Sequence, residues 1–235
     1  MARLNPSRDQ RPPRGVVKRR SLKDDVAEYL RTEILSGKMK PGQKIDQEAV
    51  AGELDVSKLP VREALISLES EALIENIPRR GAFVASLTPE DVYDHYAIYG
   101  LISSLAAERA AERLPESDLD ELERIIDGME RAQDPGEHEE LNFAFHRIIN
   151  QAGASRRLIS VLRLFSLDIP SRFFEFTPDW NAKAVAQHRA IVERLRARDA
   201  AGAGAAMRDH LRSGGEQAVR ALDAAGFWSS QDADG

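Results

Sequence analysis

The stretch from Val56 to Leu65 constrains the fold of this chain more than any other. Ser57 stands just before a run with helical periodicity, where its hydroxyl can cap the first free backbone N–H groups of a helix. Pro60 falls in the first turn, where a missing N–H costs little. One side of the expected helix is apolar and would face a core, through Val61, Leu65 and Leu68.

The segment before this helix predicts a partner helix at a tight connection. Pro41-Gly42 forms a turn, and Asp46 can cap a short helix over residues 47–54. Only Asp55 and Val56 then remain before the second helix. This arrangement is a helix-turn-helix, in which the second helix enters the major groove of DNA.

The segment after the helix predicts a β-hairpin. Residues 72–77 and 81–85 are short β-prone runs, joined by a turn that carries Arg79, Arg80 and Gly81. Lys58 and Arg62, four residues apart, lie on one side of the preceding helix near its N-terminus. A cationic helix followed by a cationic hairpin is typical of a winged helix that binds DNA.

At these residues the sequence resembles the winged-helix domain of the GntR family of bacterial transcription regulators. The resemblance spans about residues 21–87. It rests on Gly37…Pro41-Gly42, Val56-Ser57…Pro60-Val61-Arg62-Glu63-Ala64-Leu65, Glu71-Ala72-Leu73 and Gly81-Ala82-Phe83-Val84. Lys58 stands where the family usually has arginine, and Leu59 where it often has a small polar residue. Lysine carries a single ammonium group, whereas the arginine guanidinium can donate two hydrogen bonds to guanine at once. Recognition of guanine at that position is therefore weakened.

We therefore expect double-stranded DNA as a partner. Arg62 and Lys58 would reach base edges, and the other residues would position the protein on phosphate. A salt bridge to a helix neighbour is the alternative role for Arg62. The expected DNA-binding residues are Ser57, Lys58, Leu59, Arg62, Arg79, Arg80 and Gly81.

The distribution of charge along the chain also indicates that its N-terminal part binds DNA. The 235 residues carry a net charge of −6, but residues 1–87 hold 16 Lys and Arg against 13 acids, whereas residues 88–235 hold 17 against 26. A basic N-terminal part joined to an acidic C-terminal part is expected when only the N-terminal part contacts DNA phosphates. There is no cysteine and no apolar run long enough to span a bilayer, so we expect a cytoplasmic protein without membrane contact.

Residues 88–235 show helical patterns and no strand pattern. We divide the chain into a disordered basic leader (1–20), a winged helix (21–87), a helical domain (88–228) and a tail (229–235). Thr88, Pro89 and Asp91 mark a capped helix start. Helices are expected over about 89–113, 117–133 and 137–152, from 155, over about 177–198 and from 199. In the first of these, Leu101 and Leu105 are expected to pack together with Ala106, Ala107, Ala110 and Ala111. The fold class is mainly α, with an antiparallel bundle as the second domain.

Three of the five histidines lie at the edge of an apolar stripe, each on a different helix of the expected bundle: His146, His188 and His210. Asn142 is four residues before His146 and shares its face. Imidazoles that converge inside a bundle can hold a divalent metal ion with coordination positions left open. Taken singly, each histidine also fits a satisfied core residue. His138, on a polar face beside acids, is expected at the surface.

The helical half resembles the FCD domain of the FadR-type branch of the GntR family, over roughly residues 89–222. That domain's metal pattern is an acid, a Phe-His phrase four residues on, and one histidine on each of two later helices. The matching positions are Asn142, Phe145-His146, Gln187-His188 and His210. Asn142 replaces the aspartate that is common in the family, and an amide oxygen is a weaker ligand. Zinc is the first expectation, with nickel and manganese as alternatives. His95 and Tyr99 stand where the family commonly has an arginine and a glutamate that bind the effector.

The sequence therefore predicts a dimeric repressor rather than an enzyme. A small organic acid would bind at the metal site and change affinity for an inverted-repeat operator. Two alternatives remain: a metal-dependent hydrolase or oxygenase that uses the three histidines, and a regulator in which the metal is purely structural.

Overall fold

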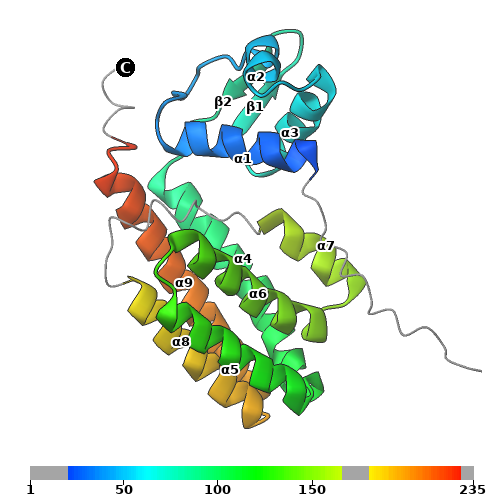
Figure 1. The fold of residues 1–235 in the computed structure, drawn as a ribbon, viewed down its shortest axis with the longest axis vertical. Helices are drawn as coiled ribbons and strands as arrows, with labels where there is room; N and C mark the ends of the chain where they lie inside the picture. Colours follow the sequence, from blue (N-terminus) through cyan, green and yellow to red (C-terminus); the bar gives the residue numbers. More distant parts are fainter. Residues whose placement is uncertain (1–20, 166–179, 229–235) are drawn as a thin grey trace, which may run out of the picture.

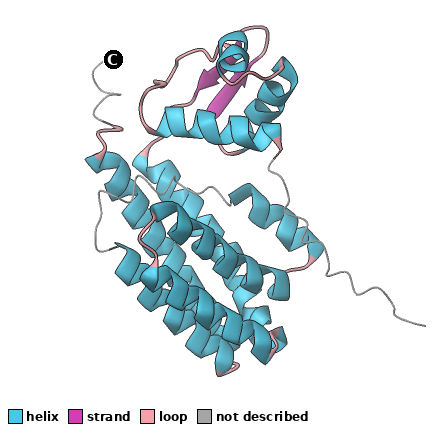
Figure 2. Ribbon diagram, in the orientation of Figure 1, coloured by secondary structure: helices cyan, strands magenta, loops and turns pink. Residues whose placement is uncertain are grey.

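The computed structural model describes residues 21–165 and 180–228. The expected leader 1–20, the tail 229–235 and the start of the helix expected at residue 177 lie outside these ranges. In the described residues a small unit with two strands sits on one end of a helical bundle (Figures 1 and 2).

The small unit is a winged helix. It consists of α1 (Leu22–Leu35), α2 (Gln47–Glu53), α3 (Lys58–Ser70), β1 (Ile74–Ile77) and β2 (Gly81–Val84). Asp46 caps α2, as expected, by accepting from the backbone N–H groups of Glu48 and Ala49. The expected hydroxyl cap at Ser57 is wrong, because the Ser57 side chain makes no capping hydrogen bond.

The two strands form an antiparallel hairpin with Ile77 opposite Gly81. The turn between them is tight enough to place both Arg79 and Gly81 at positive φ, of 65° and 105°. An isolated bridge from Lys44 to Phe83 holds the segment before α2 against the hairpin. The hairpin is thus held by the pairing of its own strands and by the segment before α2.

The bundle contains α4 (Pro89–Arg113), α5 (Glu116–Arg131), α6 (Pro135–Gly153), α7 (Arg156–Phe165), α8 (Trp180–Arg196) and α9 (Ala200–Ala224). Thr88 and Asp91 form the expected capping box at the start of α4. The long helices α4 and α9 lie against each other, and α5, α6 and α8 complete the bundle (Figure 1).

One expectation for α4 is wrong. Its four alanines, Ala106, Ala107, Ala110 and Ala111, are fully buried, but Leu101 and Leu105 are 56% and 39% exposed. The inner face of α4 is lined by small residues, which let α6 approach so closely that Gly153 has no room for a side chain beside the Ala106 backbone. The leucines therefore lie on the outer face.

The winged helix and the bundle share a hydrophobic core. Residues from α1, α3 and the hairpin cluster with Val92 of α4 and with the last turns of α9, through Ala218, Ala221 and Leu222. Phe227 belongs to the same cluster, and the indole Nε1 of Trp228 donates to the Leu87 carbonyl at 2.8 Å. The two units are thereby joined by packing as well as by the chain.

Candidate functional site

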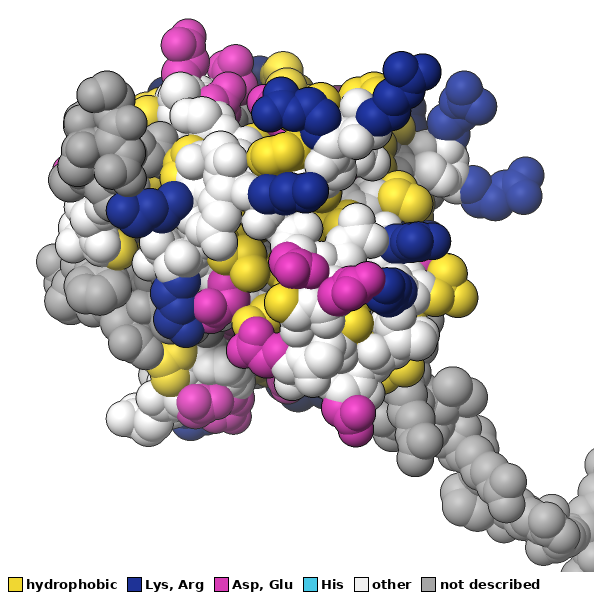
Figure 3. Space-filling model, turned by 90° about the horizontal axis from the view of Figure 1, so that it is seen from above, with side chains coloured by type: hydrophobic (Ala, Val, Ile, Leu, Met, Phe, Trp, Pro, Cys, Tyr) yellow, Lys and Arg dark blue, Asp and Glu magenta, His cyan; other side chains and the backbone are white. Residues whose placement is uncertain are grey.

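The DNA-facing residues expected from the sequence lie on the surface of the winged helix. Ser57, Lys58, Leu59 and Arg62 are exposed at the N-terminal end of α3, and Arg79 and Arg80 are exposed at the wing. The back of α3 is buried through Val61, Ala64, Leu65 and Leu68. Seen from above, Lys and Arg side chains project from one edge of the winged-helix end (Figure 3).

The cations on α3 are not equivalent. Lys58 makes an ion pair with Glu48 of α2. Arg62 makes no ion pair with another residue in the described ranges, so its guanidinium is available to an external partner. At the wing, the Arg80 guanidinium lies over the Phe83 ring at 5.4 Å, which orients it. Arg62 and Arg80 thus make no ion pair with the described residues, and their contact with nucleic acid stays a prediction.

The structure brings together the three histidines that the sequence singled out. The Nε2 atom of His210 on α9 lies 3.1 Å from that of His188 on α8 and 3.3 Å from that of His146 on α6. All three side chains are buried, with exposed fractions of 8% for His146, 0% for His188 and 4% for His210. Potential ligand atoms of the three residues lie within 4.8 Å of one another.

A hydrogen bond orients the His210 ring, and aromatic rings pack against the cluster. Nδ1 of His210 lies 3.1 Å from the Gln187 amide oxygen. Because that oxygen only accepts, Nδ1 carries the proton and Nε2 presents a lone pair to the cluster. The Trp180 ring stacks on His210, and the Phe145 ring lies against His188 with centroids 4.2 Å apart.

Burial keeps the imidazoles neutral. It lowers the pKa of His146 to about 4. Burial, and then the neighbouring imidazoles, hold the pKa values of His188 and His210 well below the usual range. Neutral imidazoles are the form that binds a metal ion.

The spacing of the nitrogen atoms fits a shared cation. Ligand nitrogens at about 2.1 Å from one metal ion lie about 3.0 Å apart at right angles and about 3.4 Å apart in a tetrahedron. The two Nε2 distances, 3.1 and 3.3 Å, fall in this interval. Nδ1 of His146 and of His188 has no hydrogen-bond partner among the described residues.

The other sequence-predicted residues have different surroundings. Asn142 is half-buried on α6, one turn before His146, and its coordination stays a prediction. Nε2 of His95 lies 3.1 Å from the Phe165 carbonyl oxygen, and burial lowers the pKa of His95. Tyr99 packs against the bundle core. His138 is not a surface residue as expected: it is half-buried, because α6 turns it toward the bundle, and burial lowers its pKa.

Gln187, which contacts the cluster, and three buried polar residues of the bundle were not predicted as part of a site. Gln187 reaches His210 only because α8 and α9 are antiparallel neighbours, and a distance of 23 positions in sequence gives no sign of it. Ser103, Asn150 and Ser213 have buried oxygen atoms without a partner among the described residues. These residues follow Tyr99, His146 and His210 by about one helical turn.

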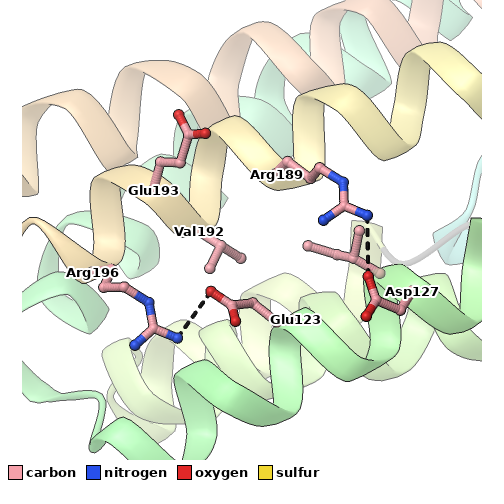
Figure 4. A pocket seen from close by; sticks show the side chains of 7 residues that line it. Glu123, Asp127, Arg189, Val192, Glu193 and Arg196 are labelled. Carbon is pink, nitrogen blue, oxygen red and sulfur yellow. Dashed lines mark hydrogen bonds and ion pairs between the residues drawn. The ribbon is translucent and has the colours of Figure 1, made fainter.

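A separate groove lies between α5 and α8 (Figure 4). Its two arginines are held by acids: Arg189 binds Asp127 and Glu130, and Arg196 binds Glu116, Asp120 and Glu123. The groove is therefore a surface seam of ion pairs, whereas His188 points from α8 into the bundle.

Comparison with known proteins identifies both halves of the chain. Residues 22–84 match the model of the bacterial regulatory proteins of the gntR family, and residues 94–213 match the FCD domain. The chain belongs to the GntR family. This GntR regulator is 30% identical over 173 residues to the HTH-type transcriptional regulator YdhC of Bacillus subtilis strain 168, with 71% of this chain and 77% of YdhC covered.

Two further relatives span most of the chain. The HTH-type transcriptional repressor RspR of Escherichia coli K12 is 26% identical over 220 residues, which cover 90% of this GntR protein and 95% of RspR. The structure of McbR/YncC from E. coli shares the fold, with a TM-score of 0.64 and 22% identity over 83% of this chain and 95% of that one.

The GntR protein is thus a DNA-binding transcription regulator with a domain that suggests a small-molecule effector, and it has repressor-type homologues. These domains and homologues indicate a regulator rather than an enzyme. None of the helices within residues 21–165 and 180–228 carries an apolar stretch that could cross a bilayer.

Proposed function

We propose that this regulator is a dimeric repressor whose affinity for an inverted-repeat operator changes when a small organic acid binds at a divalent metal ion. His146, His188 and His210 would hold the ion, with zinc as the first candidate. The observation that carries the proposal is the convergence of three buried Nε2 atoms. When bound, the cation supplies positive charge and open coordination positions for a carboxylate.

Three buried polar side chains on the bundle helices have an oxygen without a partner among the described residues. The buried oxygens of Ser103, Asn150 and Ser213 need hydrogen-bond partners, which a bound acid or water would supply. They come from α4, α6 and α9, the helices that also carry His95, His146 and His210. We propose that His95 and Tyr99 contribute to the same site.

Helix α9 offers the route from this site to DNA. It carries His210 at its middle and contributes Ala218, Ala221 and Leu222 to the core of the winged helix. Between these points Gly214 and Gly215 lie against the Tyr96 ring of α4. A ligand that binds one position of α9 more tightly than another would therefore shift the winged helix as well.

The metal-dependent hydrolase is the weaker alternative. Within the described residues, the grouped potential ligands are three histidines without a carboxylate. The neighbouring polar groups are amides and hydroxyls, which are poor general bases at neutral pH. A site with three histidines and no adjacent base fits ligand capture better than catalysis.

The test combines metal analysis with operator binding. Natively purified protein should contain close to one divalent ion per chain by mass spectrometry, and His188→Ala should lose it. His138→Ala is the matched control, because it removes another half-buried histidine of the bundle and should keep the ion.

Operator affinity should then be measured by fluorescence anisotropy across a panel of small carboxylates. At least one acid should change the affinity of the wild-type protein and leave that of His188→Ala unchanged. Metal-free protein that responds to the same acid would contradict the proposal. A metal-loaded protein that responds to no acid would favour a purely structural metal.

A further inference from the structure

An ion pair joins the N-terminal ends of the two helices of the helix-turn-helix. Glu48 is the second residue of α2, and Lys58 is the first residue of α3. The Lys58 ammonium donates a hydrogen bond to Oε1 of Glu48 where the two helices pack together. Both side chains are open to solvent, with exposed fractions of 75% for Glu48 and 51% for Lys58. The pair is therefore accessible to an external partner.

The backbone around the pair is held by hydrogen bonds. The Glu48 N–H donates to the capping carboxylate of Asp46 at 2.9 Å. The turn between the two helices is closed by a hydrogen bond from the Val56 N–H to the Ala51 carbonyl at 3.0 Å, and Asp55 in this turn has a φ of 51°. Side chains on such a backbone lose little further freedom when they bind a ligand, which favours selective recognition.

The position of Glu48 is unfavourable for a residue that serves stability alone. An exposed ion pair contributes little to the free energy of unfolding. In a helix-turn-helix the N-terminal end of the second helix is the part that reaches base edges, and a carboxylate there is repelled by phosphate. Because the Glu48 carboxylate is bonded to Lys58, it lies wherever that ammonium reaches. A role in the choice of base would account for its place.

The pair presents a hydrogen-bond acceptor next to a donor. In a charge-assisted hydrogen bond the nitrogen and oxygen atoms lie about 2.7–2.9 Å apart. The major-groove edge of a C·G base pair has the N4 donor of cytosine next to the O6 acceptor of guanine, and these two atoms are bonded to each other at about 2.9 Å. The carboxylate can therefore accept from cytosine while the ammonium donates to the guanine of the same base pair.

The other three base pairs fit this ion pair less well. With adenine on the carboxylate side, A·T also has a donor beside an acceptor, but adenine N7 is a second acceptor that repels the carboxylate. The thymine methyl group then stands where guanine would offer N7 to the ammonium. In the reverse orientations, G·C and T·A place an acceptor against the carboxylate and a donor against the ammonium. C·G is thus favoured on both sides.

We propose that Glu48 and Lys58 together read one C·G base pair in each operator half-site, with Glu48 on cytosine and Lys58 on guanine. The inference deepens the proposed function and rests on its operator binding, but not on the metal ion or the acid. Because the ion pair is neutral as a whole, it adds little to affinity and acts mainly on the choice of base pair.

The test is selection of operator sequences by the full-length protein from a library of randomised DNA duplexes. The wild type should enrich one position per half-site that depends on Glu48, with cytosine on one strand. Glu48→Gln should enrich adenine at that position and leave the rest of the motif unchanged, because an amide accepts from adenine N6 and donates to adenine N7.

Glu69→Gln is the matched control. Glu69 is exposed near the other end of α3, and about 16 Å of helix separates it from Lys58. Its replacement removes the same charge from the winged helix without reaching the ion pair. This variant should select the motif of the wild type.

Fluorescence anisotropy at fixed salt then measures the preference with two duplexes that differ only at this base pair. The wild type should bind the C·G duplex about fivefold or more tightly than the A·T duplex, as expected for one specific contact. This ratio should fall to about one or below in Glu48→Gln, and Glu48→Ala should also lose the preference. Far-UV circular dichroism should show the same helix content in every variant.

The inference is overturned if Glu48→Gln keeps the motif and the cytosine preference of the wild type. A variant that binds every duplex more tightly without a change of motif would show that Glu48 only neutralises Lys58. Both outcomes leave the proposed regulation standing. Operator affinity that ignores metal and every carboxylate would defeat the regulation and leave the reading of C·G in place, whereas a wild type that enriches no motif would defeat both.

Discussion

At the scale of single residues, Arg62 and Lys58 show how an ion pair within the protein makes a charged side chain less available to an external partner. Both are exposed at the start of α3, but Lys58 is paired with Glu48 and Arg62 has no such pair in the described ranges. Arginine also offers a fork of donors that fits guanine, which lysine does not. We therefore expect Arg62 to contribute more to operator recognition than Lys58.

Replacing Arg62 with alanine should cost about 1–3 kcal/mol of operator binding, or roughly a fivefold to 150-fold loss of affinity, because a bidentate contact to a base would be lost. Lys58→Ala should cost less, since the Lys58 charge is already partly neutralised by Glu48. Fluorescence anisotropy with operator DNA at fixed salt measures both. Wild-type affinity in the Arg62→Ala protein would refute the assignment.

The buried histidines make the metal-free fold sensitive to acid. The unfolded chain binds a proton at each histidine near pH 6.5, whereas the folded His146 has a pKa of about 4. Between these values the unfolded state holds more protons, so the stability of the fold decreases as the pH falls from about 6.5 toward 4.

For His146 alone the loss is up to about 3 kcal/mol, and His188 and His210 shift in the same direction. Urea denaturation of chelated protein at pH 7 and pH 5 should show the difference. A His146→Gln variant should show a smaller one. Equal stability at both pH values would mean that the rings become protonated without unfolding cost.

At the scale of the elements, the sequence predicted where helices begin and end better than which way they face. Asp46, Thr88 and Asp91 carry local capping chemistry, and the helices of the described residues begin within two or three residues of the expected positions. Leu101 and Leu105 were wrongly expected inside. The periodicity of α4 shows two apolar faces, and only the packing of α6 and α9 decides which one is buried.

The histidine cluster was predicted from the sequence, but the other polar residues of the bundle interior were not. Spacing on three helices selected His146, His188 and His210, because each lies beside an apolar stripe that had to face inward. Gln187 and the buried oxygens of Ser103, Asn150 and Ser213 were missed, since a polar residue near the centre of a helix gives no sign of what it faces. The misplacement of His138 has the same origin.

The close contact of α4 and α6 provides an element-scale prediction. A Cβ at Gly153 would collide with the Ala106 backbone, so Gly153→Ala must push the two helices apart. We expect a loss of about 1–3 kcal/mol or more in the free energy of unfolding. Gly52→Ala on α2, where nothing lies within 4 Å of the added carbon, should be neutral or slightly stabilising. Urea denaturation compares the two, and equal stability of both variants would contradict the clash.

At the scale of the whole molecule, the shared core makes the winged helix and the bundle depend on each other. Val92, Ala218, Ala221 and Leu222 come from the bundle helices but pack with the core of the winged helix. The residue ranges that match the two family models are therefore separate in sequence but not in packing.

We expect the wild-type protein to unfold in one calorimetric transition. Leu222→Ala removes a fully buried side chain from the shared core and should cost about 2–5 kcal/mol. It should also separate the melting of the winged helix from that of the bundle. Two transitions already present in the wild type would show that the shared core does not couple the units.

The contact between the last helix and the winged helix has a consequence for how the protein is made. A ribosome releases residues 21–87 long before residues 218–228, yet Ala218, Leu222, Phe227 and Trp228 complete the packing of that first-made part. The apolar surface of the newly synthesised winged helix therefore stays exposed to solvent until the end of α9 leaves the ribosome. A frameshift or proteolytic cut near residue 215 would thus weaken the winged helix, although it removes none of the residues that are expected to face DNA.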